Sequence, residues 1–293
     1  MKRISRPRPR HAILQQSDGA RWSFTTEETC PDPTLYLLED VDGWYGGSGV
    51  RRKVTDRYGH GNFMGPGFRD GRAMTLKATI LCDGPDERDW QERNVSGMLW
   101  DGLTGELWVD DGETMLGSPV ALDGAPQVVK SGTRALRIQV PLISEEPFVY
   151  SEWREVTLDP PGLGVGFEFP PFSKEPGDEP VITFGAEVNR QEYVWNEGNA
   201  DSYPQFTVFA DSPGGFALGL ADRLVTYPWP TYPDVPVVVD MAGALFVGGR
   251  DQTHLIGERN WSHIPATSLD VPVFKFLQGG TGFCTVAHRD TYI

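Results

Sequence analysis

The sequence has few cysteines, few basic residues relative to acidic ones, and no long apolar run. Its three cysteines, Cys30, Cys82 and Cys284, lie far apart in a chain of 293 residues. An odd number of cysteines without short spacing fits neither a disulfide framework nor a zinc site. This cysteine usage is typical of folding in a reducing cytoplasm. No run of about 18 apolar residues occurs, so we expect no membrane span.

The shortage of basic residues makes the chain strongly acidic. It carries 26 Lys and Arg against 41 Asp and Glu, a net charge of -15. This charge argues against specific nucleic-acid binding and favours a cationic partner. Residues 1–10 are the exception, because they are basic and contain no acid. No apolar core follows them, so we do not expect a secretory signal.

Motifs for catalysis and cofactor binding are also missing. A G-x-S-x-G nucleophile elbow is absent. His254 and His263 lack the three or four convergent ligands that a metal site needs. We therefore predict no catalytic residue, no metal ligand and no cofactor. One enzymatic alternative is a glycan hydrolase with Glu192 and Asp240, which would need these carboxylates about 5–9 Å apart in one cleft.

Turn-forming residues are abundant and point to a mostly β chain. Gly 34 and Pro 24 are spread along the sequence, and alternating segments recur through both halves. One helix is expected after Asp83, which would be its cap, with Pro85 in the first turn and Trp90 and Met98 on one face. The Asp-Pro-Pro-Gly run at residues 159–162 predicts the boundary between domains 1–162 and 163–293, each with its own core.

A cluster of cations marks residues 50–70. Glycines punctuate the segment, but the strand-to-helix context and the Lys-Ser/Thr end of a phosphate loop are missing. We expect a long hairpin or loop whose cations form an oligomer interface. The interface cations are Arg51, Arg52, Lys53, Arg57 and Arg69. The acidic loop at residues 40–49 is their candidate counterpart on a neighbouring copy.

Aromatic residues alternate with prolines at residues 227–233. Tyr227, Trp229 and Tyr232 could present ring faces to a sugar. The alternative is a proline-stiffened loop whose rings pack on the sandwich or on a neighbour. A glycan site and a packing role both remain open at this point.

The segment at residues 193–209 predicts a β-hairpin. Alternating residues surround an Asn-Glu-Gly-Asn turn, whose residues tolerate positive φ. The run Asn196-Glu197-Gly198-Asn199-Ala200 and the following Phe206-Thr207-Val208 resemble the C-terminal domain of the distal tail (Dit) proteins of phages with long non-contractile tails. Further similar segments follow the family order: residues 71–80, 158–160, 223–227, 237–240, 255–265, 279–282 and 285–293. His288 stands where the family ending has an aromatic residue.

The resemblance implies a mostly β fold with an N-terminal β-sandwich or split-barrel ring domain carrying one helix, and a C-terminal galectin-like β-sandwich. It implies a structural virion protein of the tail tip, made in the host cytoplasm, without catalysis. Its partners would be copies of itself in a homohexameric ring, the tail tube protein and the tail-tip protein. The alternative function is a carbohydrate-binding module that contacts host cell-wall saccharide.

Overall fold

The computed structural model describes residues 9–26, 35–160 and 192–293, and the chain forms two compact units. The first unit is Met1–Glu152 with Thr291–Ile293, and the second is Trp153–Asp290. The described residues form strands and a single α-helix, which confirms the mostly β prediction. Cys30 and residues 161–191 lie outside the described residues.

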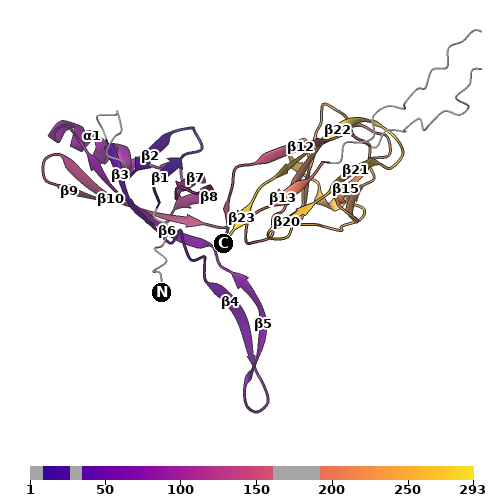
Figure 1. Ribbon diagram of the computed structural model, residues 1–293, viewed down its shortest axis with the longest axis horizontal. Coiled ribbons are helices and arrows are strands. Elements are labelled where there is room, and N and C mark those ends of the chain that lie inside the picture. Colours follow the sequence, from indigo (N-terminus) through magenta and orange to yellow (C-terminus); the bar gives the residue numbers. More distant parts are fainter. Residues whose placement is uncertain (1–8, 27–34, 161–191) are drawn as a thin grey trace, which may run out of the picture. The chain divides into compact units, whose positions relative to one another are not determined.

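The first unit is a closed β-barrel (Figure 1). A pairing between β8 and β10 closes a ring of seven strands, in the order β8-β7-β1-β2-β3-β6-β10. Strands β23, β11 and β9 extend the same sheet, and β4 pairs only with β5. The strands of this unit are β1 (His11–Gln15), β2 (Arg21–Thr25), β3 (Leu35–Asp42), β4 (Val50–Asp56), β5 (Asn62–Arg69), β6 (Arg72–Leu81), β7 (Gly105–Asp110), β8 (Met115–Leu122), β9 (Gln127–Ser131), β10 (Ala135–Ser144), β11 (Val149–Tyr150) and β23 (Thr291–Tyr292).

The barrel interior is filled by alternate residues of its long strands. In β6, Met74, Leu76, Ala78 and Ile80 are buried, while the residues between them are partly exposed. Strand β10 pairs with β6 along its whole length and buries alternate residues in the same way. Because side chains alternate between the two faces of a strand, this period of two is what a barrel with a solvated outside requires.

The predicted helix is α1 (Pro85–Ser96), and its start differs from the expectation. Gly84 occupies the N-cap position without a side-chain hydrogen bond, so Asp83 is not the cap. The Glu87 carboxylate instead accepts a hydrogen bond from the Asp83 backbone N–H, at 2.6 Å. Met98, just after the helix, is buried in the barrel core, whereas Trp90 is 57% exposed. The apolar spacing therefore identified the helix but misplaced its tryptophan.

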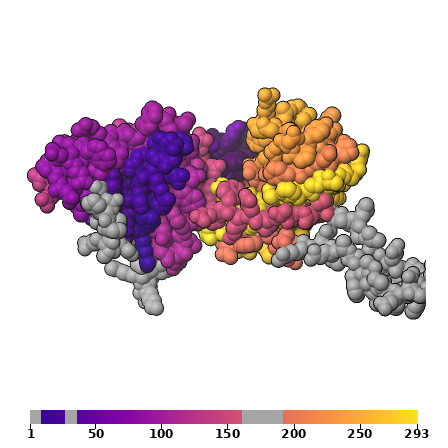
Figure 2. Space-filling model, turned by 90° about the horizontal axis from the view of Figure 1, so that it is seen from above, coloured from indigo at the N-terminus to yellow at the C-terminus, as the bar shows by residue number. Residues whose placement is uncertain are grey.

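The second unit is a β-sandwich built around a separate core. One sheet has the order β12-β22-β14-β17-β18-β19, a second has the order β16-β15-β21, and β13 pairs with β20. Figure 2 shows β12 beside β22 on the surface of this unit. The elements are β12 (Arg154–Leu158), β13 (Val194–Asn196), β14 (Gln205–Asp211), β15 (Phe216–Leu220), β16 (Arg223–Tyr227), β17 (Val237–Asp240), β18 (Ala244–Val247), β19 (Arg250–Asp251), the 3₁₀ helix η1 (Thr253–Leu255), β20 (Ser268–Asp270), β21 (Pro272–Phe276) and β22 (Thr281–His288).

The division between the units differs from the expected domain boundary at residues 159–162. It falls at Glu152, and Thr291–Ile293 return to the first unit through the pairing of β23 with β11. Strand β12, which the sequence assigns to the end of the first domain, pairs with β22, and its Leu158 belongs to the second core. Independent folding of domains 1–162 and 163–293 remains a prediction.

The hairpin expected at residues 193–209 is wrong in its pairing. Strands β13 and β14 both form, but β13 pairs with β20 and β14 pairs with β22 and β17. The intervening turn is held from elsewhere, because Ser202 bridges to Ile264. The turn residues therefore reverse the chain, but the two strands on either side of the turn, β13 and β14, do not pair with each other.

Candidate functional site

The cations of residues 50–70 lie on a β-hairpin that contributes nothing to the barrel core. Strands β4 and β5 form a two-stranded sheet of their own, which extends away from the barrel (Figure 1). Every residue of β4 is exposed, and no residue of either strand belongs to the core cluster of this unit. We call residues 50–69 the arm. The prediction of a long hairpin for this segment is confirmed.

The two faces of the arm carry different side chains. Val54 lies opposite Met64, which is 75% exposed, and Val50 lies four residues before Val54 on the same face. Arg51 lies opposite Phe68 on the other face. That other face also carries Lys53, Arg57 and Phe63. One face thus combines Val50, Val54 and Met64 with Arg52 and Arg69, and the other combines cations with aromatic rings.

The five predicted interface cations are differently engaged. Arg51 forms an ion pair with Asp70 at 3.4 Å, and Arg69 donates to the Ser48 carbonyl oxygen at 3.2 Å. The Arg57 guanidinium lies 4.4 Å from the centre of the Phe63 ring. Arg52 and Lys53 make no ion pair among the described residues. These contacts are exposed and leave the arm's positive charge available to a partner.

An isolated two-stranded hairpin in water is marginally stable at best. The arm buries no apolar side chain in the core of its unit and exposes Val50, Val54, Phe63, Met64 and Phe68. Large apolar side chains exposed on both faces of one hairpin make that hairpin a candidate interaction site. The arm is therefore the strongest candidate for a contact surface in the first unit.

The acidic loop at residues 40–49 is partly used within its own chain. The carboxylate of Asp42 pairs with the ammonium group of Lys77, and this contact lowers the pKa of Asp42. Trp44 is buried in the barrel core, and its carbonyl oxygen accepts a hydrogen bond from the buried Arg72. This loop therefore offers less free negative charge to the arm of a second copy than its sequence suggests.

The predicted aromatic site in the second unit is only partly exposed. Trp229 is 49% and Tyr232 59% exposed, and the Trp229 indole N–H donates to the Leu255 carbonyl oxygen at 3.0 Å. Tyr227 is only 4% exposed, stacks on Phe216 and belongs to the core, where burial raises its pKa. Tyr227 is therefore a core residue and cannot contact a glycan, which leaves Trp229 and Tyr232.

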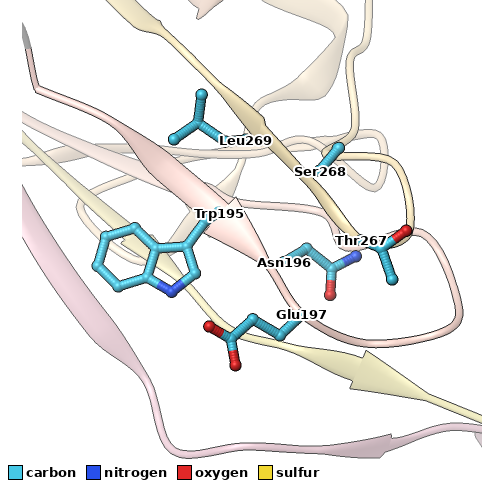
Figure 3. Close-up of a pocket in the computed structure, with 6 residues that line it drawn as sticks. All are labelled: Trp195, Asn196, Glu197, Thr267, Ser268 and Leu269. Atoms are coloured by element: carbon cyan, nitrogen blue, oxygen red, sulfur yellow. The ribbon is translucent and has the colours of Figure 1, made fainter.

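A surface pocket of about 550 Å³ lies on the sheet formed by β13 and β20 (Figure 3). Sequence analysis did not predict this site. Its lining residues are Trp195, Asn196, Glu197, Thr267, Ser268 and Leu269. The indole of Trp195 and the carboxylate of Glu197 extend to the same side of β13 in Figure 3.

Two charged residues of the same unit contact Trp195 and the backbone of Glu197, which line this pocket. Arg154 pairs with Asp290 at 2.6 Å, and its guanidinium lies 4.6 Å from the centre of the Trp195 ring. The same two side chains bond the free edge of β13: Arg154 donates to the Trp195 carbonyl oxygen, and Asp290 accepts from the Glu197 backbone N–H. An ion pair thus takes the place of a neighbouring strand, which blocks pairing at this edge.

His288 packs edge-on against Trp195, with the ring centres 4.8 Å apart. It is completely buried, and neither ring nitrogen has a hydrogen-bond partner of good geometry among the described residues. Burial lowers the pKa of His288 to about 4, and the nearby Arg154 acts in the same direction. His288 therefore stays neutral in the folded unit at neutral pH.

The acids considered for a hydrolase do not form a recognisable pair. Asp240 ends β17, and its carboxylate accepts a hydrogen bond from the Ala242 backbone N–H at 2.8 Å. Glu192 precedes β13, which lies in a different sheet.

Among the described residues, no group of three or more His, Cys, Asp or Glu could hold a metal ion. The helices of the described ranges include none long and apolar enough to cross a membrane.

Comparison with solved structures identifies the fold. No protein-family model and no curated protein matches the sequence. The Dit protein of phage SPP1, described as a paradigm of the hub adsorption apparatus in phages that infect Gram-positive bacteria, matches with a TM-score of 0.57 and 13% identity. The match covers 88% of this chain and 94% of the SPP1 protein. The chain therefore has the fold of a phage distal tail protein.

Two structures of the activated phage P2 baseplate also match over nearly the whole chain. The one with Ca has a TM-score of 0.47 and the one with Sr a TM-score of 0.49, each at 9% identity. They cover 96% and 95% of this chain respectively, and 97% of their own chains. At these TM-scores the two baseplate structures add no argument to the SPP1 comparison.

Proposed function

We propose that this chain is a structural virion protein, a distal tail protein that forms a ring at the hub of a phage tail. In this role it joins the tail tube to the tail-tip protein, and it carries no catalytic site or cofactor. The fold shared with SPP1 Dit supports the tail role. The protein would be made in the host cytoplasm and reside at the tail tip of the virion, in a ring of six copies.

The observation that carries the ring proposal is the arm. It exposes apolar and cationic side chains on a hairpin that its own unit does not stabilise. A ring needs one surface that docks on a different surface of the next copy, because such head-to-tail contacts close when the rotation allows it. The arm is such a surface, and the acidic remainder of the chain provides complementary charge for Arg51, Arg52, Lys53, Arg57 and Arg69.

The test compares the assembly state of the full chain with that of a variant in which two cations of the arm are replaced by acids. Light scattering and electron microscopy, with the tail-tip partner added where the chain alone stays monomeric, would detect rings. The double variant Arg51→Glu/Arg52→Glu should lose rings while its thermal unfolding stays unchanged. The matched control Arg134→Glu/Arg137→Glu reverses two exposed cations of the barrel and should still assemble. Normal rings from the arm variant would remove the arm from the interface.

A second candidate function is carbohydrate binding by the second unit. The observation that favours it is the fixed and half-exposed ring of Trp229, with the exposed Tyr232 close in sequence. The hydrogen bond of the indole N–H holds the ring at the surface, which suits stacking on a sugar. Trp229→Ala should abolish adsorption to host wall polysaccharide and change stability by no more than about 1 kcal/mol. Unchanged adsorption by this variant would exclude the glycan role.

A further inference from the structure

The pocket on β13 and β20 has one open face with an ordered set of side chains. Trp195 lies opposite Leu269 in the strand register, and Glu197 and Thr267 adjoin the paired residues and line the same pocket. The other face of β13 carries Val194 and Asn196, which are buried in the unit. Two apolar groups therefore adjoin a carboxylate and a hydroxyl on one exposed surface.

The polar groups of this pocket are almost all hydrogen-bond acceptors. The Thr267 hydroxyl donates to the Ala266 carbonyl oxygen at 2.8 Å, and the Ser268 hydroxyl donates to the Pro265 carbonyl oxygen at 2.7 Å. The protons of both hydroxyls are thus engaged, and their lone pairs remain. A carboxylate accepts only, so Glu197 adds further acceptors. The Trp195 indole N–H is the one side-chain donor among the lining residues that is not already bonded to the backbone.

The charge of the pocket is negative. Arg154 lies next to Trp195, but Asp290 neutralises it at 2.6 Å. Glu197 has no ion-pair partner among the described residues. An acceptor-lined, negatively charged pocket beside an indole and an isobutyl group fits a cation that carries several N–H donors and an apolar stem.

We propose that this pocket binds a basic side chain, arginine or lysine, of a protein partner. The charged head group donates to the Glu197 carboxylate and the Thr267 hydroxyl oxygen, and the aliphatic stem covers Leu269 and the edge of Trp195. An amino sugar offers the same charge but lacks the long stem that the two apolar groups would cover. This site lies outside the arm, so it does not depend on the ring proposal.

The experiment titrates the full chain with Nα-acetyl-arginine methylamide and with its neutral counterpart, Nα-acetyl-citrulline methylamide. Ligand-observed NMR or calorimetry should detect binding of the arginine compound and much weaker binding of the citrulline compound. Glu197→Gln should weaken arginine binding about tenfold, since it removes a charge-assisted hydrogen bond. Leu269→Ser should weaken it about threefold by removing the apolar contact of the stem.

Glu258→Gln is the matched control, because it removes an exposed carboxylate of the same unit outside the pocket and should leave binding unchanged. Thermal unfolding of all three variants checks that the unit stays folded. The proposal fails if the chain does not bind the arginine compound, if citrulline binds equally well, or if Glu197→Gln retains full affinity. Tighter binding of glucosamine than of the arginine compound would overturn the assignment to a protein side chain.

Discussion

The two isolated two-stranded sheets of the molecule, β4–β5 in the first unit and β13–β20 in the second, differ in what stabilises them. Strand β13 buries Val194 and Asn196 in the core of its unit and has its free edge bonded by Arg154 and Asp290. The arm places no side chain in the core cluster of the first unit. A two-stranded sheet persists in water when a neighbour covers it. β13–β20 has that neighbour within its chain, whereas the arm has no such cover from the core cluster of its own unit.

The comparison separates stability from assembly. Substitutions in β13–β20 should change the free energy of unfolding, because they remove contacts within one chain. Substitutions in the arm should change association and leave unfolding nearly unaffected. Four variants test this difference, beginning with the one expected to have the largest effect on stability.

Removing the acid that holds the edge of β13 should be the most damaging change. Asp290→Ala leaves the largely buried Arg154 without its ion-pair partner and the Glu197 backbone N–H without its acceptor. Breaking such a pair costs about 3–5 kcal/mol. Urea unfolding of Asp290→Ala should show this loss, and the exposed-acid control Asp222→Ala should not. A loss below about 1 kcal/mol would mean that the ion pair does not hold this edge.

Asn196 is the buried polar residue of the same sheet. Its side-chain amide donates to the Ala200 carbonyl oxygen at 2.7 Å and to the Ile264 carbonyl oxygen at 3.2 Å, and its oxygen accepts from the Gly198 N–H. Asn196→Ala removes the partners of the Ala200 carbonyl oxygen and the Gly198 N–H and should cost about 2–3 kcal/mol. Asn260→Ala, at an exposed position of the same unit, is the control. An equal cost for both variants would contradict the role of burial.

His288 should make the second unit sensitive to acid. Its pKa is lowered by burial from 6.5 to about 4, so the unfolded chain takes up a proton at a higher pH than the folded unit does. Stability should therefore fall as the pH decreases from about 6.5 to about 4, by about 2 kcal/mol after allowing for solvent screening, with no contribution from this group above that range. Unfolding experiments across this pH range measure the effect.

His288→Phe removes the titrating group and fills the site with an aromatic ring beside Trp195. Because this variant has no imidazole to protonate, its stability should not decrease between about pH 6.5 and 4. At neutral pH its stability should equal or exceed that of the original chain, because both ring nitrogens of His288 are buried without hydrogen-bond partners of good geometry. The exposed His254→Gln variant should keep the original pH dependence. Retention of the acid sensitivity in His288→Phe would assign it to another group.

The smallest change in stability is expected in the arm. Val54→Ser exchanges an exposed side chain that contacts no core residue, so the free energy of unfolding should change by about 0.5 kcal/mol or less. The same variant should weaken assembly, measured by light scattering, because it removes an apolar side chain from the arm, the proposed contact surface. Val129→Ser, at an exposed valine of β9, is the control for assembly. A large loss of stability would show that the arm is held by its own unit.

Much of the local structure could be predicted from the pattern of residues. Alternation in residues 71–81 identifies β6, and the glycine-rich basic segment identifies the arm hairpin. Both follow from local chemistry, because the period of two and the turn residues act over a few positions. The exposure of the arm cations is likewise a local property, since charged side chains stay in water unless they are paired.

The sequence by itself therefore determined many of the strand segments, where the helix lies and which residues carry charge. The tertiary structure alone decided that β13 pairs with β20, that β12 joins the second unit, and that Tyr227 is buried while Trp90 is exposed. The pocket at Trp195 and Glu197 arises from the first of these pairings. A strand's alternation specifies its two faces but not its neighbour, because the neighbour is selected by contacts between segments far apart in the chain, and only the folded core brings these segments together.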